Sequence, residues 1–173
     1  MKIFLNPGHG GKDPGAVSKS GLKEKDVCKT ICDILAKKLK ADGHLVIVYQ
    51  EQKTYFEITK QENKSGADLF VSVHCNSFSN PAANGVETLY YPTSARGKKL
   101  AECVQDSLLK STELFNRGCK MRRDLHVLKA TKAPAVLVEC AFISNPVEEK
   151  LLKNYPEAFA KGIFEGLKNY IKA

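Results

Sequence analysis

Four side chains of this 173-residue sequence carry chemistry that their neighbours in the chain do not explain, and they are His9, Glu24, His74 and Glu139. Imidazole nitrogens and carboxylate oxygens bind zinc, and both groups also transfer protons near neutral pH. Each histidine has a plain structural interpretation as well: His9 as a surface residue of a glycine-rich loop, and His74 as a core residue that donates to a carbonyl. Chemistry is expected only if the fold brings these side chains together.

Glu24 stands at the start of a segment with helical periodicity, where an acidic residue complements the helix dipole. Its neighbours three, four and seven positions on are Val27, Cys28 and Ile31, so its side chain shares the face that should point into the core. An unpaired buried charge is costly, and therefore a cation or a metal ion is the expected partner of Glu24.

Glu139 lies within the segment 135–143, where every other residue is apolar. Glutamate is almost never fully buried without a partner. One interpretation is a structural salt bridge. The other is a carboxylate held at the end of a strand for proton transfer.

Apolar periodicity predicts strands and helices in alternation along the chain. The predicted strands are 2–6, 45–49, 69–75, 86–91, 125–129 and 135–140. The predicted helices are one through 27–39 that stops at Gly43, then 55–65, 96–114 and 147–171, the last broken near Pro156. This alternation predicts an α/β fold: a single layered domain over residues 1–173, with a mostly parallel twisted sheet flanked by helices.

In such a sheet the carboxyl ends of parallel strands form one rim, and ligand sites lie there. His9, His74 and Glu139 all follow or end predicted strands, and Glu24 begins the helix after the first strand. Two imidazoles and one carboxylate form a catalytic zinc set that leaves a fourth position open. Glu139 would then lie outside the ligand shell and be available as a base.

Composition limits the remaining classes of protein. Hydrophobic residues make up 43% and charged residues 27% of the chain, which excludes collagen-like, disordered and membrane-spanning classes. The net charge of +8 favours polyanionic partners, but the basic residues are spread out and no nucleic-acid-binding signature accompanies them. We therefore expect no nucleic-acid partner, no membrane insertion, and a solvated cluster of basic residues at 120–123.

The chemistry-bearing residues lie in motifs that resemble a known family. The motifs are Asn-Pro-Gly-His-Gly-Gly-Lys-Asp-Pro-Gly-Ala (6–16), Glu24 at a helix start, Ser-Val-His-Cys-Asn (72–76) and Val-Leu-Val-Glu-Cys-Ala-Phe-Ile-Ser-Asn-Pro (136–146). With the segments 85–88 and 127–130 between them, they are similar to the zinc-dependent N-acetylmuramoyl-L-alanine amidases of the amidase-3 type. This resemblance implies one zinc ion per chain, bound by His9, Glu24 and His74, with Glu139 as the catalytic carboxylate.

Two positions depart from the pattern of that family. Asn6 stands where members usually carry Asp, and Lys60 stands where they usually carry Arg, while Asn63 matches. Neither is an implied metal ligand, so the departures concern substrate fit. The stretch between His74 and Glu139 has no room for the inserted helix that blocks regulated members, and we predict an uncovered site.

Zinc-binding histidines usually donate their second ring N–H to an acceptor. Asn6, Asp13 and Asn76 are candidates for this role because they lie near His9 or His74 in the sequence. His44 and His126 are expected at the surface or in local hydrogen bonds, and neither is expected to bind the metal.

The resemblance implies hydrolysis of the amide between the lactyl group of N-acetylmuramic acid and L-alanine in bacterial peptidoglycan. Glu139 is expected to take a proton from the attacking water and to return it to the departing amine. The alternatives are a zinc peptidase acting on peptidoglycan stem peptides and a non-catalytic polyanion-binding module. We expect a monomer that acts on the cell wall as an autolysin or a released phage endolysin, and this chain opens without a signal peptide.

Overall fold

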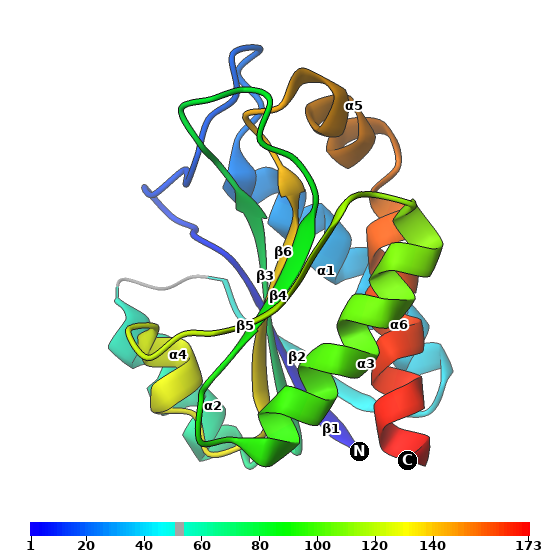
Figure 1. Ribbon diagram of the computed structural model, residues 1–173. Helices are drawn as coiled ribbons and strands as arrows, with labels where there is room; N and C mark the ends of the chain where they lie inside the picture. The colour runs from blue at the N-terminus through cyan, green and yellow to red at the C-terminus, as the bar shows by residue number, and fades with distance from the viewer. Residues whose placement is uncertain (51–53) are drawn as a thin grey trace.

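The computed structural model describes residues 1–50 and 54–173 and is built around one six-stranded sheet. The strands lie in the order β2-β1-β3-β6-β4-β5 (Figure 1). Their bounds are Lys2–Pro7 for β1, Leu45–Val48 for β2, Leu69–Asn76 for β3, Val86–Tyr90 for β4, Asn116–Met121 for β5 and Ala135–Phe142 for β6. All neighbouring pairs are parallel except β4 and β6, which are antiparallel, so the predicted mostly parallel sheet is confirmed.

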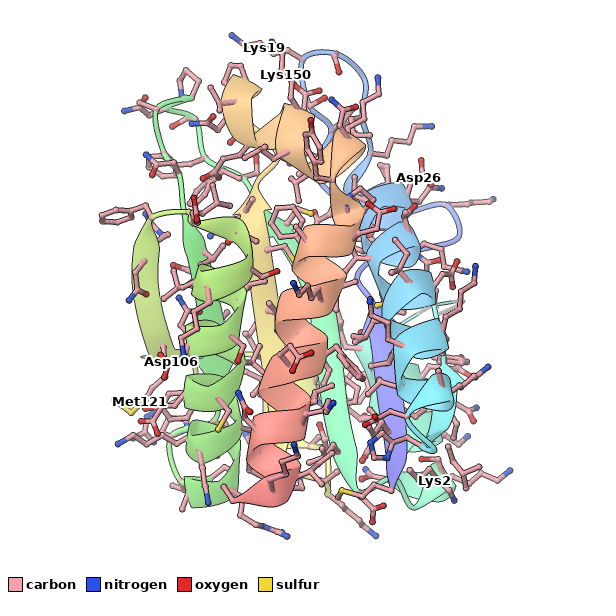
Figure 2. All side chains as sticks on the ribbon, turned by 90° about the vertical axis from the view of Figure 1, so that its right-hand side faces the viewer. Lys2, Lys19, Asp26, Asp106, Met121 and Lys150 are labelled. Atoms are coloured by element: carbon pink, nitrogen blue, oxygen red, sulfur yellow. The ribbon has the colours of Figure 1, made fainter. Side chains whose placement is uncertain are left out.

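Helices cover both faces of this sheet. Figure 2 shows α1, α6 and α3 side by side across one face, while α2 and α4 lie on the other face (Figure 1). The bounds are Glu24–Ala41 for α1, Tyr55–Ser65 for α2, Ala95–Thr112 for α3, His126–Lys129 for α4, Pro146–Asn154 for α5 and Pro156–Lys172 for α6. The larger apolar core lies under α1, α3 and α6, and a smaller one lies under α2 and α4.

The local sequence explains where several elements begin and end. Gly43 follows α1 with a φ of 85°, the left-handed conformation that glycine adopts without strain after a helix. Asn145 accepts hydrogen bonds from the first backbone N–H groups of α5, and Pro146 occupies the first turn. The predicted break near Pro156 separates α5 from α6. The core strand β3 is buried on both faces, as its nearly continuous apolar run predicts.

Between residues 114 and 130 the structure departs from the sequence predictions at two elements, one predicted wrongly and one not predicted. The segment 125–129 was predicted to be a strand, but its residues His126–Lys129 form the short helix α4, because Val127 and Leu128 both pack into the smaller core. The strand β5 was not predicted at all. Its sequence Asn-Arg-Gly-Cys-Lys-Met is mostly polar and lies at the edge of the sheet, where little apolar burial is required.

The close packing of α6 on α3 depends on glycine. A Cβ added at Gly166 would lie 2.5 Å from the Cα of Val104 and 2.8 Å from the backbone oxygen of Cys103. Neither of these backbone atoms can rotate away as a side chain can. We therefore infer that Gly166 sets the distance between the two helices.

Gly166→Ala is expected to lower the free energy of unfolding by about 1–3 kcal/mol, because overpacking outweighs the better helix propensity of alanine. Chemical denaturation of the parent and the variant measures this difference. Lys161→Ala, at an exposed position of the same helix, is the control and should change the free energy little. A Gly166→Ala protein as stable as the parent would contradict the close-approach argument.

Candidate metal centre

His9, Glu24 and His74 meet at the rim formed by the carboxyl ends of β1 and β3. His9 lies in the loop after β1, Glu24 is the first residue of α1, and His74 lies near the end of β3. Each offers one ligand atom, and these three atoms all lie within 4.8 Å of one another. The rim lies at the end of the sheet where α5 is found (Figure 1). The structure thus brings together three residues that are up to 65 positions apart in the chain.

Glu24 joins the two histidines. Its Oε2 lies 3.0 Å from His9 Nε2, and its Oε1 lies 3.0 Å from His74 Nδ1. The same carboxylate accepts hydrogen bonds from the backbone N–H groups of Ala16, at 2.9 Å, and Cys75, at 3.0 Å. Glu24 is only 4% exposed, as the helical spacing predicts. The two histidines and the two backbone N–H groups are the partners of this buried carboxylate.

The electrostatics of the group follow from these contacts. The hydrogen bond with Glu24 raises the pKa of His9 to about 9, against the opposing effect of burial, and the hydrogen bond with Asp13 adds to the increase. Burial raises the pKa of Glu24, but the hydrogen bonds with His74 and His9 outweigh it and hold that pKa well below its ordinary value. Without a metal ion, His9 therefore favours its protonated form beside the ionised Glu24 carboxylate.

The donor set of this group fits zinc. Two imidazole nitrogens and one carboxylate oxygen are ligands that catalytic zinc sites use, and three protein ligands leave one position open. His9 Nδ1 lies 2.8 Å from Asp13 Oδ2, so its Nε2 is the nitrogen that faces Glu24. A carboxylate on the outer nitrogen is the usual way to orient a metal-binding histidine. Among the three orienting candidates, Asp13 thus has the predicted contact.

The other two candidates have different partners. Asn76 donates to Glu87 Oε1 at 3.2 Å. Asn6 accepts from the hydroxyl of Ser72 at 2.9 Å and donates to the backbone oxygen of Tyr49 at 2.9 Å. Asn6 therefore joins β1 to β3 and to the residue that follows β2.

The glycine-rich loop packs tightly against the group. A Cβ at Gly15 would lie 2.5 Å from the ring of His9 and 2.7 Å from Glu24 Oε2, and a Cβ at Gly8 would lie 2.5 Å from the ring of His74. His9 itself has a φ of 60°, which is uncommon for a residue with a side chain. Such backbone strain is typical of functional sites, and here it occurs at a residue whose ring contacts Glu24.

Glu139 lies on β6 directly beside His74, its register partner on β3. Its Oε2 is buried and has no hydrogen-bond partner among the described residues. Burial raises the pKa of Glu139 to about 7. The unpartnered oxygen does not fit a structural salt bridge and does fit a group that exchanges protons.

The salt bridge of this region is made by Glu87, which sequence analysis did not single out. Glu87 is the register partner of Glu139 on β4, and its Oε2 lies 2.9 Å from Arg117 Nε and 2.5 Å from Lys120 Nζ. Lys120 is therefore paired, although we predicted a solvated cluster at 120–123. The one feature of the sequence that pointed to Glu87 is its position within the family motif 85–88.

His44 and His126 are not part of the group of three ligands. His44 Nε2 lies 3.5 Å from Asp42 Oδ2, in a local contact. The ring of His126 contacts that of Phe56 in a tilted arrangement, with 4.4 Å between centroids, and its Nε2 lies 3.2 Å from the hydroxyl of Thr59. His44 has the expected local partner, whereas the partners of His126 come from α2, far away in the sequence.

The site opens into a cavity of about 490 Å³ on the face of the sheet that carries α2 and α4. His9, His74 and Glu139 line it, and the side chains of the two histidines are 22% and 17% exposed. Both histidine rings are therefore partly accessible to solvent. A mostly parallel α/β sheet with a partly buried His-Glu-His group at its rim defines a candidate mononuclear metal enzyme.

Comparison with known proteins places the chain within one family. Residues 3–169 match the Amidase_3 model, described as N-acetylmuramoyl-L-alanine amidase, and the chain belongs to this family of peptidoglycan amidases. The family is generally zinc-dependent. Membership supports an enzyme over the alternative of a non-catalytic polyanion-binding module.

Several relatives and solved structures are similar over nearly the whole chain. The amidase LytC of Bacillus subtilis is 37% identical over 98% of the chain, but the chain spans only 35% of LytC. The germination-specific amidase of the same species is 31% identical over 97% of the chain, which spans 78% of that protein. An amidase structure from Clostridium difficile 630 has a TM-score of 0.92 at 34% identity, covering 99% of this chain and 97% of that one.

A second structural neighbour, the amidase AmiC2 of Nostoc punctiforme, has a TM-score of 0.93 at 30% identity and covers 100% of this chain and 98% of that one. These likenesses agree with the single sheet and its flanking helices. In the ranges 1–50 and 54–173, no helix combines the length and the apolar character that crossing a bilayer requires.

Proposed function

We propose that this chain hydrolyses the amide between the lactyl group of N-acetylmuramic acid and L-alanine in peptidoglycan, with one zinc ion held by His9, Glu24 and His74. The observation that carries this proposal is the convergence of the three ligand atoms within 4.8 Å beside the unpartnered Glu139. A bound zinc ion supplies Lewis-acid chemistry: it polarises a carbonyl oxygen and makes water more acidic.

The residues around the ligands prepare the site for an ion. Asp13 holds the His9 ring through Nδ1, so that Nε2 stays directed at Glu24. The backbone N–H groups of Ala16 and Cys75 keep the Glu24 carboxylate in place. Pre-positioned donors reduce the ordering that ion binding requires.

Glu139 moves the proton in the proposed reaction. Glu139 lines the same cavity as the histidines, and its Oε2 has no hydrogen-bond partner among the described residues. The carboxylate takes one proton from the attacking water. It then gives that proton to the nitrogen of L-alanine, which leaves as an amine when the amide bond breaks.

We also propose that residues 1–173 act as one monomeric catalytic domain on the bacterial cell wall. The names of relatives support this place of action: LytH of Staphylococcus aureus, 33% identical over 99% of the chain, is named a probable cell wall amidase. The chain spans 58% of LytH and 35% of LytC.

Product analysis of digested peptidoglycan tests the proposed function. The purified protein loaded with one equivalent of zinc is expected to release peptides with a new amino-terminal L-alanine, and a chelator should abolish the release. Re-addition of zinc is the control for the chelator. New termini at any other peptide bond would instead indicate a peptidase that acts on the stem peptides. No new termini at all would overturn the amidase and the peptidase assignments alike.

A further inference from the structure

The cavity extends beyond the metal ligands, along the face of the sheet towards α4. Its floor past Glu139 is apolar and is made by Leu137 on β6 and Leu89 on β4, which are register partners. Ile58 of α2 and Val127 of α4 line the same stretch. A ligand whose reacting bond lies beside Glu139 can therefore continue over this apolar floor.

The length of the floor corresponds to a short piece of peptide. Leu137 precedes Glu139 by two residues on the same strand, so roughly 7 Å separates these positions. An extended peptide advances by about 3.3–3.6 Å per residue, and two residues therefore cover the floor. The group at the far end would meet the second residue of a bound peptide, counted from the amide at Glu139.

Arg122 directly follows β5, the second strand from β6, and lies beyond Leu89 at this end of the cavity. Its backbone N–H donates to the carbonyl of Tyr90 at 3.0 Å, which fixes the residue next to β4, and its side chain lines the cavity. Asp124 accepts from its Nε at 2.8 Å and from one terminal nitrogen at 2.6 Å. A guanidinium carries five N–H donors, so this pairing orients the group and leaves a second edge for another acceptor.

The charges in the cavity favour a carboxylate at Arg122. Among the described residues that line the cavity, Arg122 is the one arginine or lysine. Of the acids there, Asp13 is paired with His9 and Asp124 with Arg122, while Glu139 is the group proposed to transfer the proton. Lys120 lies nearby, but it is bonded to Glu87.

The substrate itself indicates which part supplies this carboxylate. The lactyl carboxyl of the sugar is consumed in the amide that is cleaved, so the free carboxylates belong to the peptide. Arginine binds carboxylates through two parallel hydrogen bonds, which gives both affinity and geometric selectivity.

We propose that Arg122 is a specificity residue that binds a carboxylate on the second residue of the peptide. This inference rests on the proposed function, since the position of the reacting amide beside Glu139 sets the distance. The ligand class is an acidic peptide. Asp124 acts on it indirectly, by orienting Arg122.

A pair of substrates that differ in one group tests the proposal. Two N-acetylmuramoyl-L-alanyl peptides are compared, one with a free carboxylate and one with a carboxamide on the second residue. The parent enzyme is expected to prefer the carboxylate by about tenfold or more in kcat/KM, the selectivity that a hydrogen bond to a charged group supplies. Arg122→Ala should reduce the ratio to near one, mainly by slowing cleavage of the carboxylate substrate.

Arg123→Ala is the matched control, because Arg123 is the exposed neighbour outside the cavity lining, and it should keep the parent ratio. Equal cleavage of both substrates by the parent, or an unchanged ratio in Arg122→Ala, would overturn the role of Arg122 while leaving the proposed function intact. Cleavage of neither substrate by the zinc-loaded parent would instead overturn the proposed function, and the role of Arg122 with it.

Discussion

Glu139→Gln is expected to lower kcat by about 10²–10⁴-fold, the range that a positioned acid–base group contributes, while zinc content stays at one per chain. Glutamine keeps the size of the side chain but can no longer accept the proton from water. Glu139 lies beside His74 on the neighbouring strand and is not one of the three converging ligands, so metal binding should not depend on it. Peptidoglycan hydrolysis and metal analysis on the same preparation measure the two effects.

The chain offers a matched control in Glu62. Its Oε2 is likewise buried without a hydrogen-bond partner among the described residues, and burial likewise raises its pKa. Glu62 lies on α2 and does not line the cavity. Glu62→Gln is therefore the same chemical change in a similar environment, and it should leave kcat within about twofold of the parent, as remote substitutions do.

Stability separates a catalytic role of Glu139 from a structural one. Its unpartnered oxygen contributes no hydrogen bond that glutamine would lose, and a neutral amide costs less to bury than a carboxylate. The free energy of unfolding of metal-free Glu139→Gln should therefore not fall below that of the parent. A variant that keeps near-normal turnover would refute the assigned role.

The parts of the fold that local pattern determines agree with the sequence predictions. The helix 55–65 has the predicted bounds, and the break near Pro156 separates α5 and α6, because periodicity and proline act locally. The strand β5 and the helix α4 did not follow from the sequence. Both are short, and their conformation depends on the edge of the sheet and on the smaller core against which they pack.

Only the part of the site that follows from the sheet topology could be predicted from the sequence. Strand ends of a parallel sheet meet at one rim, so the meeting of His9, Glu24 and His74 follows from their positions after β1 and on β3. The position of Glu87 directly opposite Glu139 on the neighbouring strand could not be predicted. It depends on β4 lying antiparallel to β6, and no local pattern encodes that placement. The same placement brings Arg117 and Lys120 to Glu87 and leaves Glu139 unpaired.

His74→Ala is expected to weaken zinc binding by more than about 100-fold, since loss of a ligand should exceed the 10–100-fold cost of losing a group that only orients one. Amidase activity should fall to background at equimolar zinc. The ring of His74 contributes one of the three converging ligand atoms, and it also bonds Glu24 Oε1. Competition with a chromogenic chelator gives the affinity.

His44→Ala provides the control for this variant, because His44 is a histidine outside the group of three and contacts Asp42. It should bind zinc with the parent affinity. That result would show that the loss of a histidine weakens zinc binding only when the histidine belongs to the site. A His74→Ala protein that still binds one zinc tightly would place the ion elsewhere in the chain. In that case His9, Glu24 and His74 would form a structural cluster held by hydrogen bonds. Glu139 would then have no adjacent ion, and the proposed proton transfer would lose its basis.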